Sequence, residues 1–278
     1  MRAEPGGEVT GFCRINLPDK ENLDTAFLFP FVHPARRRQG LGSDLLRHAA
    51  ARAAAEGRTL LRATTYAGSA GAKFAAHAGA KAGLVSIRRV LHLRQIPDGL
   101  VAAQHAKATA AAAGYTLVSW AGGTPSEYAE GVADVLNAFG DAPADEGYER
   151  ETWDAERVRD EFDKIIQWDA VRRYSVAAMH AETGEMAGLT QVYATPEEPA
   201  WAQQGLTAVA RTHRGHRIGL LVKTAMLDWL ATAEPAVEHI TTDNAYSNQY
   251  MITINEMLGF EILSPPYQWH QMPISDVP

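Results

Sequence analysis

The sequence is short of cysteine, of positive charge and of long apolar runs, and each shortage excludes a class of protein. Cys13 is the single cysteine among 278 residues, so the chain can form neither an intrachain disulfide nor a zinc site built on several thiolates. Asp and Glu outnumber Lys and Arg by 33 to 26, and this net negative charge disfavours general binding to nucleic acid. No apolar run approaches the roughly 18 residues that a membrane-spanning helix needs. We therefore expect a cytoplasmic protein without a metal site and without nucleic-acid or membrane partners.

What the chain does have is a regular alternation of two patterns. Its hydrophobic content of 46% is ordinary for a globular protein with a core, and its length favours two domains. Short stretches rich in β-branched and aromatic residues alternate with Ala- and Leu-rich amphipathic stretches, which predicts strands and helices in turn. The alternation indicates the α/β or α+β class.

Two related segments lie far apart in the chain. Residues 37–42 read Arg-Arg-Gln-Gly-Leu-Gly, and residues 214–219 read Arg-Gly-His-Arg-Ile-Gly. Each follows an apolar strand and opens a helix, and each is followed by a strand and a short helix in the same order. We interpret this agreement as a tandem duplication.

The second segment places cationic groups between a strand and a helix. The first backbone N–H groups of a helix lack intrahelical partners, and the helix dipole adds partial positive charge there. Glycines allow a ligand to approach the backbone, and Arg211, His213, Arg214, His216 and Arg217 add further charge. The pattern predicts an anion site, such as one for a pyrophosphate. A solvated basic loop with a glycine turn is the alternative.

A second signal lies downstream, in residues 244–260. If this stretch is helical, Asn248 and Asn255 lie on one face among apolar residues. Buried amides need partners. They either cross-link the fold or line the polar arm of a ligand, and the sequence leaves both alternatives open.

These residues resemble the GCN5-related N-acetyltransferases, the GNAT family, which use acetyl-CoA. The family's phosphate motif is Gln/Arg-x-x-Gly-x-Gly/Ala. Residues 37–42 fit it completely, whereas residues 214–219 carry Arg217 in place of the central glycine. The resemblance covers nearly the whole chain, twice. It implies an α+β fold with two GNAT-type domains, each a mixed, mostly antiparallel sheet flanked by helices.

The resemblance also implies that the two halves are unequal. The first half has too few residues before its motif to hold the opening strand and helices of the family. We expect a truncated GNAT-like domain at residues 1–96, a helical linker at 97–113 and a complete GNAT domain at 114–278.

By the same resemblance, the end of one strand, the motif after it and an asparagine downstream bind acetyl-CoA. The implied cofactor-binding residues are Val32, Arg37, Arg38, Gln39, Gly40, Leu41 and Gly42 in the first half, and Val209, Arg211, Arg214, Gly215, His216, Arg217, Ile218, Gly219 and Asn248 in the second.

The chemistry implied is direct attack by an amine on the thioester in a ternary complex. His213 and Asp243 are candidate bases near the cofactor strands. Many family members place an acidic tyrosine where this chain has Asn255, so Tyr250 or water would have to protonate the leaving thiolate.

The function expected is acetyl-CoA-dependent acetylation of a primary amine of a small molecule, in the C-terminal domain. A homodimer is a possible assembly. The alternative is a catalytically degenerate CoA-binding or structural tandem GNAT protein, which Arg217, Asn255 and the shortened first half favour.

Overall fold

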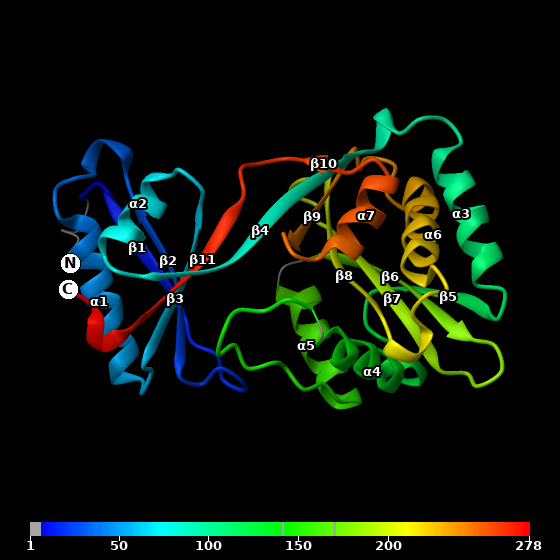
Figure 1. The fold of residues 1–278 in the computed structure, drawn as a ribbon, viewed down its shortest axis with the longest axis horizontal. Helices are drawn as coiled ribbons and strands as arrows, with labels where there is room; N and C mark the ends of the chain where they lie inside the picture. Colours follow the sequence, from blue (N-terminus) through cyan, green and yellow to red (C-terminus); the bar gives the residue numbers. More distant parts are fainter. Residues whose placement is uncertain (1–6, 141, 169–170) are drawn as a thin grey trace. The chain divides into compact units, whose positions relative to one another are not determined.

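The computed structural model describes residues 7–140, 142–168 and 171–278, which divide into two compact units (Figure 1). Unit 1 contains residues up to 86 together with Pro143–Arg150 and Pro265–Pro278. Unit 2 contains Ile87–Ala142 and Glu151–Ser264. The chain therefore passes between the units several times. One strand, β4 (Lys81–His92), begins in unit 1 and ends in unit 2.

Unit 1 is a sheet with helices on one face. Its elements are β1 (Gly11–Asn16), β2 (Thr25–Val32), the 3₁₀ turn η1 (Pro34–Arg36), α1 (Leu41–Ala55), β3 (Leu60–Tyr66), α2 (Ala70–His77), the first half of β4, β11 (Tyr267–Pro273) and the 3₁₀ turn η5 (Ile274–Asp276). The strand order is β1-β2-β3-β11-β4, in which only β2 and β3 are parallel neighbours. The last strand of the chain thus lies inside the sheet of the first unit.

The core of unit 1 forms where α1 covers the sheet. Alanines on α1 meet alternate residues of β2 and β3, because side chains alternate between the two faces of a strand. The buried residues of this core are Ala26, Leu28, Ala49, Ala50, Ala53 and Leu61. Small alanines allow the helix to approach the sheet closely.

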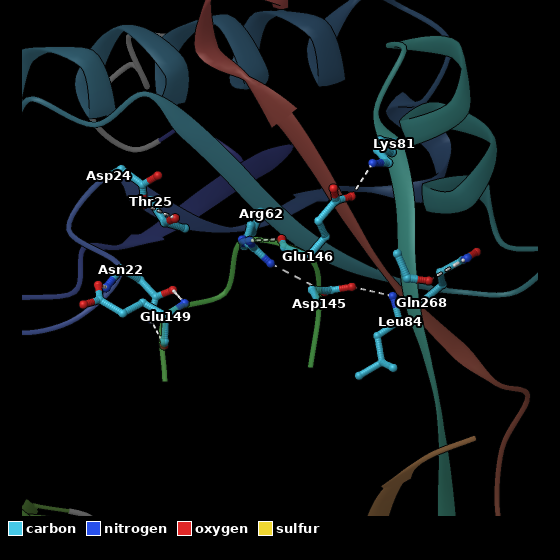
Figure 2. Close-up of polar contacts among 11 residues, drawn as sticks. Asn22, Asp24, Thr25, Arg62, Lys81, Leu84, Asp145, Glu146, Glu149 and Gln268 are labelled. Atoms are coloured by element: carbon cyan, nitrogen blue, oxygen red, sulfur yellow. Dashed lines mark hydrogen bonds and ion pairs between the residues drawn. The ribbon is translucent and has the colours of Figure 1, made fainter. Parts of the chain in front are cut away.

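The opposite face of unit 1 carries a polar strap, the segment Pro143–Arg150 (Figure 2). Arg62, only 2% exposed, donates from Nη2 to the Glu146 carbonyl at 3.0 Å, and its Nη1 lies 3.6 Å from the Asp145 carboxylate. Asp145 also accepts the Leu84 backbone N–H, at 2.5 Å. At the far end, Asn22 and Glu149 exchange three hydrogen bonds. The contacts with Asp145 and Glu146 compensate part of the cost of burying the Arg62 guanidinium.

Unit 2 is a longer sheet covered on both faces. Its elements are the second half of β4, the 3₁₀ turn η2 (Leu93–Gln95), α3 (Leu100–Ala111), β5 (Tyr115–Ala121), the 3₁₀ turn η3 (Ser126–Tyr128), α4 (Ala129–Phe139), α5 (Ala155–Trp168), β6 (Arg172–His180), β7 (Met186–Ala194), β8 (Trp201–Val209), the 3₁₀ turn η4 (Arg211–His213), α6 (Ile218–Ala233), β9 (His239–Ala245), α7 (Gln249–Met257) and β10 (Glu261–Ile262). The strand order is β4-β9-β8-β7-β6-β5, and β10 pairs with β4.

Two apolar cores flank the sheet of unit 2. On β6, Val176 packs into the core beneath α6 and α3, while the next residue, Ala177, packs into the core beneath α4 and α5. This alternation is what a strand buried on both faces requires. The helix α6 is apolar nearly all round because it lies between the sheet and α3.

The division into units differs from the expected boundaries at 1–96, 97–113 and 114–278. The segment expected to be a linker is the helix α3, which packs on α6 and buries Ala108 and Ala112 in the core of unit 2. The last residues of the chain belong to unit 1, because β11 pairs with β3 and β4. None of the helices in the described part of the chain has the length and apolar character needed to cross a bilayer.

Candidate active site

In each unit a strand is followed by a 3₁₀ turn, a loop and a helix at the segment where the sequence predicts an anion site. We refer to these two loops as the anion loops. In unit 1 the loop runs from Arg37 to the start of α1, and in unit 2 it runs from Arg214 to the start of α6. Arg37 donates from Nε to the Val32 carbonyl at 3.2 Å, and Arg214 donates in the same way to the Val209 carbonyl at 3.3 Å. The first arginine of each motif therefore holds the loop against the end of the preceding strand.

The two loops share one backbone conformation although their glycines differ. Each has two residues with positive φ at matching places. In unit 1 these are Arg38 (62°) and Gly40 (85°), and in unit 2 they are Gly215 (90°) and Arg217 (55°). Arg217 thus adopts the left-handed conformation that the missing glycine would favour. It keeps the path of the loop and adds an exposed cation directly before α6.

The last glycine of each motif serves helix packing. A Cβ on Gly42 would lie 3.3 Å from the Phe74 ring on α2, and a Cβ on Gly219 would lie 3.2 Å from Ile254 on α7. These glycines let the first turn of α1 or α6 approach the following short helix. The backbone N–H groups of that turn face no intrahelical acceptor, as an anion site requires.

Beside the loop of unit 2, the strands β8 and β9 pair only at their beginnings. The parallel pairing runs from Trp201↔His239 to Gln203↔Thr241 and stops there. Beyond this point the edge of β8 toward β9 has no strand partner among the described residues. An elongated ligand with amide groups can bind such an edge as an additional strand would.

A β-bulge lies in β8 directly after this pairing stops. Thr190 on β7 pairs with Thr207, but Val192 pairs with Gln204, so Gly205 and Leu206 together oppose Gln191. A bulge of this kind frees backbone groups from the ladder and turns them in a new direction. A Cβ on Gly205 would lie 2.5 Å from the Tyr193 ring, so the bulge also requires a residue without a side chain.

The two asparagines expected near the ligand have different roles. Asn248 caps α7, because its Oδ1 accepts the Met251 N–H at 3.3 Å. Asn255 is completely buried and donates from Nδ2 to Asn244 Oδ1 at 2.8 Å. Its own Oδ1 has no hydrogen-bond partner among the described residues. A buried, unpaired acceptor next to the strand that leaves β8 is a polar feature that a ligand donor could satisfy.

His213 lies behind the anion loop, with both ring nitrogens occupied. It is 8% exposed, its Nδ1 lies 3.0 Å from the Tyr115 hydroxyl, and its Nε2 lies 3.4 Å from the Glu185 carboxylate. His180 meets the ring of the same tyrosine edge-on, and His216 lies tilted against it, with ring centroids 5.2 and 5.7 Å from that of Tyr115. Tyr115 is the first residue of β5 and pairs with His180, the last residue of β6, so the cluster lies at that end of the two strands.

Asp243 and Tyr250 also have defined surroundings. Asp243 forms a bidentate ion pair with Arg88 of β4, with Nε–Oδ1 and Nη2–Oδ2 distances of 3.0 and 3.2 Å. Tyr250, in the first turn of α7, is 57% exposed. Within the described ranges, no group of His, Cys, Asp and Glu side chains is arranged to hold a metal ion.

Sequence reasoning missed the start of β8 and the polar side chains behind it. The apolar run in the sequence predicts a strand only from Leu206, whereas β8 begins at Trp201, because Gln203, Gln204 and Gly205 are not strand-like. Gln204 and Lys223 are buried together there, 7% and 2% exposed. No local signal in the sequence marks this start, and the extra residue is seen only in the structure, where β8 has nine residues and its counterpart β2 has eight.

The splayed parallel strands, the anion loop and the bulge define an acetyltransferase fold. The family model that matches, acetyltransferase (GNAT) domain, covers residues 2–79. A tandem GNAT protein from the clavulanic acid biosynthesis pathway has a similar structure, with a TM-score of 0.77 and 33% identity over 97% of this chain and 80% of that one. A GCN5-related N-acetyltransferase from Sphaerobacter thermophilus matches in fold, with a TM-score of 0.66 and 16% identity over 97% and 78% of the two chains. No curated protein matches the sequence.

The chain belongs to the GNAT acetyltransferase family and has the tandem arrangement of two such domains. The family and fold expected from the sequence are thereby confirmed. The residues of unit 2 fit acetyl-CoA: the N-terminus of α6 and its arginines suit phosphates, and the unpaired edge of β8 suits the amide-containing arm.

Proposed function

We propose that the protein is an acetyl-CoA-dependent N-acyltransferase that acetylates a primary amine of a small molecule, and that the chemistry takes place in unit 2. The observation that carries this proposal is the bulge at Gly205 and Leu206, where β8 separates from β9. An anion loop at one end of the strand and freed backbone groups in its middle are what a thioester substrate needs. The tandem GNAT relative supports the same conclusion.

Acetyl-CoA, when bound, supplies the acyl group. The amine nitrogen forms a bond to the acyl carbon, the carbon–sulfur bond breaks, and the thiolate takes up a proton. The amine gives its excess proton to a base or to water. A backbone N–H from the bulge would stabilise the negative charge that develops on the carbonyl oxygen, since a preorganised donor needs no reorganisation.

The residues for proton transfer stay predictions. His213 and Asp243 are the predicted bases, and Tyr250 or water is the predicted acid in place of Asn255. The amine acceptor and a homodimeric assembly are likewise predictions. A pH–rate profile of Asp243→Asn beside the wild type checks one of them, because loss of a catalytic base removes the acidic limb of the profile.

The experiment that tests the function is calorimetric titration of acetyl-CoA into the full chain and into a matched pair of variants, Arg214→Ala and Arg37→Ala. The two arginines make equivalent bonds to equivalent strand ends, so the variants differ only in the unit they affect. We expect the Arg214 change to abolish productive binding, and a panel of small amines then to release free CoA thiol only with an intact unit 2 loop.

Other outcomes would change the proposal. Transferase activity lost only with Arg37→Ala would move the chemistry to unit 1. Binding of acetyl-CoA without thiol release for any amine would support a degenerate CoA-binding protein. Absence of binding at about millimolar ligand, a Kd that corresponds to roughly −4 kcal/mol, would reject the acyltransferase function.

A further inference from the structure

Unit 2 buries a lysine in the middle of its most apolar helix. Lys223 is 2% exposed, and its Nζ lies 5.0 Å from the centre of the Phe260 ring. Its Nζ donates to Gln204 Oε1 at 2.8 Å. Burying an amine is unfavourable unless its hydrogen bonds are made. The hydrogen bond to Gln204 therefore offsets part of the cost of burying Lys223, and it ties the lysine to Gln204.

Gln204 also forms hydrogen bonds to the neighbouring strand β7. Its Nε2 donates to Thr190 Oγ1 at 2.9 Å and to the Gln191 backbone carbonyl at 2.6 Å. A carbonyl can only accept, so Nε2 must face Gln191 and Oε1 must face Lys223. Thr190 in turn bonds to Thr207 across the strands at 2.7 Å. Donors and acceptors match along the whole relay of Lys223, Gln204, Gln191 and Thr190.

The relay encloses the bulge. Gln191 is the β7 residue opposite Gly205 and Leu206, and the residues on either side of it pair with Gln204 and Thr207. In a regular ladder one residue of β8 would oppose Gln191. Here the side-chain amide of Gln204 takes the Gln191 carbonyl, so the extra residue is accommodated without an unpaired buried acceptor.

Unit 1 has neither the bulge nor the relay. Thr25 and Trp201 start equivalent parallel pairings, and Val32 and Val209 end equivalent strands, so β2 has eight residues where β8 has nine. β1 and β2 pair without a register shift. At the places of Gln204 and Lys223, counted from the strand start and the helix start, unit 1 has Leu28 and Leu46, which belong to its apolar core.

We propose that Lys223 is a positioning residue for acyl transfer, which through Gln204 holds the β8 bulge in the geometry that presents its backbone N–H groups to the thioester. The proposal rests on the proposed function for its catalytic consequence. Its structural part, that the relay fixes the bulge, stands on the contacts themselves. Lys223 touches no substrate in this account. It acts through Gln204 on the backbone of Gly205 and Leu206.

The test compares two variants of the full chain that break the relay at different ends. Lys223→Met keeps the length and apolar stem but removes the donor to Gln204 Oε1. Gln204→Glu keeps an acceptor for Lys223 but removes the donor to Gln191. We expect each to lower kcat by about tenfold to a hundredfold, since small displacements at the reacting centre have effects of this size. The KM for acetyl-CoA should stay within about threefold, because the anion loop is untouched.

A third variant controls for general loss of stability. Leu230→Ala opens a cavity on the same helix, at a fully buried residue about two helical turns beyond Lys223. It should lower the melting temperature and leave kcat within about twofold. If Leu230→Ala lowers kcat as much as Lys223→Met does, the relay has no special role and the proposal is overturned.

Hydrogen exchange separates this proposal from the proposed function. Peptides covering residues 203–209 should exchange faster in Lys223→Met and Gln204→Glu than in the wild type, with β6 unchanged. Unchanged exchange at 203–209, or a folded Lys223→Met with kcat within about twofold of the wild type, overturns the positioning role. A wild type that acetylates no amine, but whose bulge loosens in both variants, rejects the function and retains the relay.

Discussion

The two units have the same loop conformation after different strands, and this difference distinguishes the feature they share from the feature found in unit 2 alone. The left-handed residues, the arginine bonded to the strand end and the closely packed helix start recur in both. The strand before the loop does not recur, since β2 is regular and β8 is bulged. The duplicated loop is the part that we propose binds phosphates, whereas the added residue with its polar support is the part that we associate with transfer chemistry.

The faces of the two sheets differ as well. In unit 2 the helices α4 and α5 cover the face opposite α6 and bury a core there. In unit 1 the corresponding face has no helix among the described residues, and the strap Pro143–Arg150 lies on it, held by Arg62 and Asn22 (Figure 2). Phe12, Phe29 and Phe31 stay more than a third exposed. Unit 1 is thus completed by segments from distant parts of the sequence.

The largest effect expected from this comparison follows from removing Pro265–Pro278. β11 pairs with β3 over seven residues and with β4 on its other side, so the deletion splits the sheet of unit 1. We expect the peptides of β1 to β3 to lose protection from hydrogen exchange, while those of α6 keep theirs. A shorter deletion, Ile274–Pro278, is the control, because it removes core contacts but leaves β11 in place.

Retained protection of β1 to β3 in the longer deletion would contradict the prediction. It would show that unit 1 is stable without its inserted strand, and that the strands β3 and β4 can close the gap. Both outcomes are read from the same exchange experiment on the full chain and its two truncations.

A smaller effect concerns the free energy of unfolding, which the buried Lys223 makes dependent on pH and an apolar side chain at the same position would not. Burial lowers the pKa of Lys223 from 10.5 to about 7. Between these values the unfolded chain binds one more proton than the folded chain, so the free energy of unfolding rises with pH through this window. The wild type therefore loses roughly 5 kcal/mol as the pH falls from above 10.5 to below 7, from 1.36 kcal/mol per pKa unit.

Lys223→Met removes this dependence but leaves Gln204 Oε1 unpaired, at a cost of about 1–3 kcal/mol. We expect the variant to be more stable than the wild type near neutral pH and to lose that advantage by about pH 10, as the proton linkage requires. Urea unfolding of both proteins across this range measures the difference. Leu46→Met in unit 1 is the matched control and should show no such window. An identical pH dependence in wild type and Lys223→Met would contradict the assignment.

The sequence predicted the duplicated loops better than the strands that serve them. The motifs at 37–42 and 214–219 depend on local backbone conformation, and local signals such as glycine and a helix start carry that information. Family, fold class and the strand–loop–helix order could all be predicted from such local patterns.

Three features of the structure could not be predicted from the sequence, for physical reasons. The position of β11 inside unit 1 depends on pairing between residues about 200 apart in the chain, which periodicity does not encode. At the bulge in β8 the sequence reads Gln204-Gly205, which is more typical of a loop than of a strand. The roles of His213 and Asp243 depend on Tyr115 and Arg88, which are remote in sequence. Both of these predicted bases are bonded to another polar side chain of the fold, a partner that the sequence does not reveal.

The smallest effects are expected from substituting one residue of positive φ in each loop, Arg217 in unit 2 and Gly40 in unit 1. Arg217 has a positive φ without being glycine, which costs about 1–2 kcal/mol, whereas a glycine there loses roughly 0.5–1 kcal/mol more chain entropy on folding. Arg217→Gly should therefore stabilise unit 2 by up to about 1 kcal/mol in urea unfolding. Gly40→Ala should destabilise unit 1 by about the same amount, since a Cβ there meets no neighbour and only the backbone strain counts. Calorimetry with acetyl-CoA then isolates the charge: if Arg217 contacts phosphate, the more stable Arg217→Gly binds more weakly, and unchanged binding would make its role conformational.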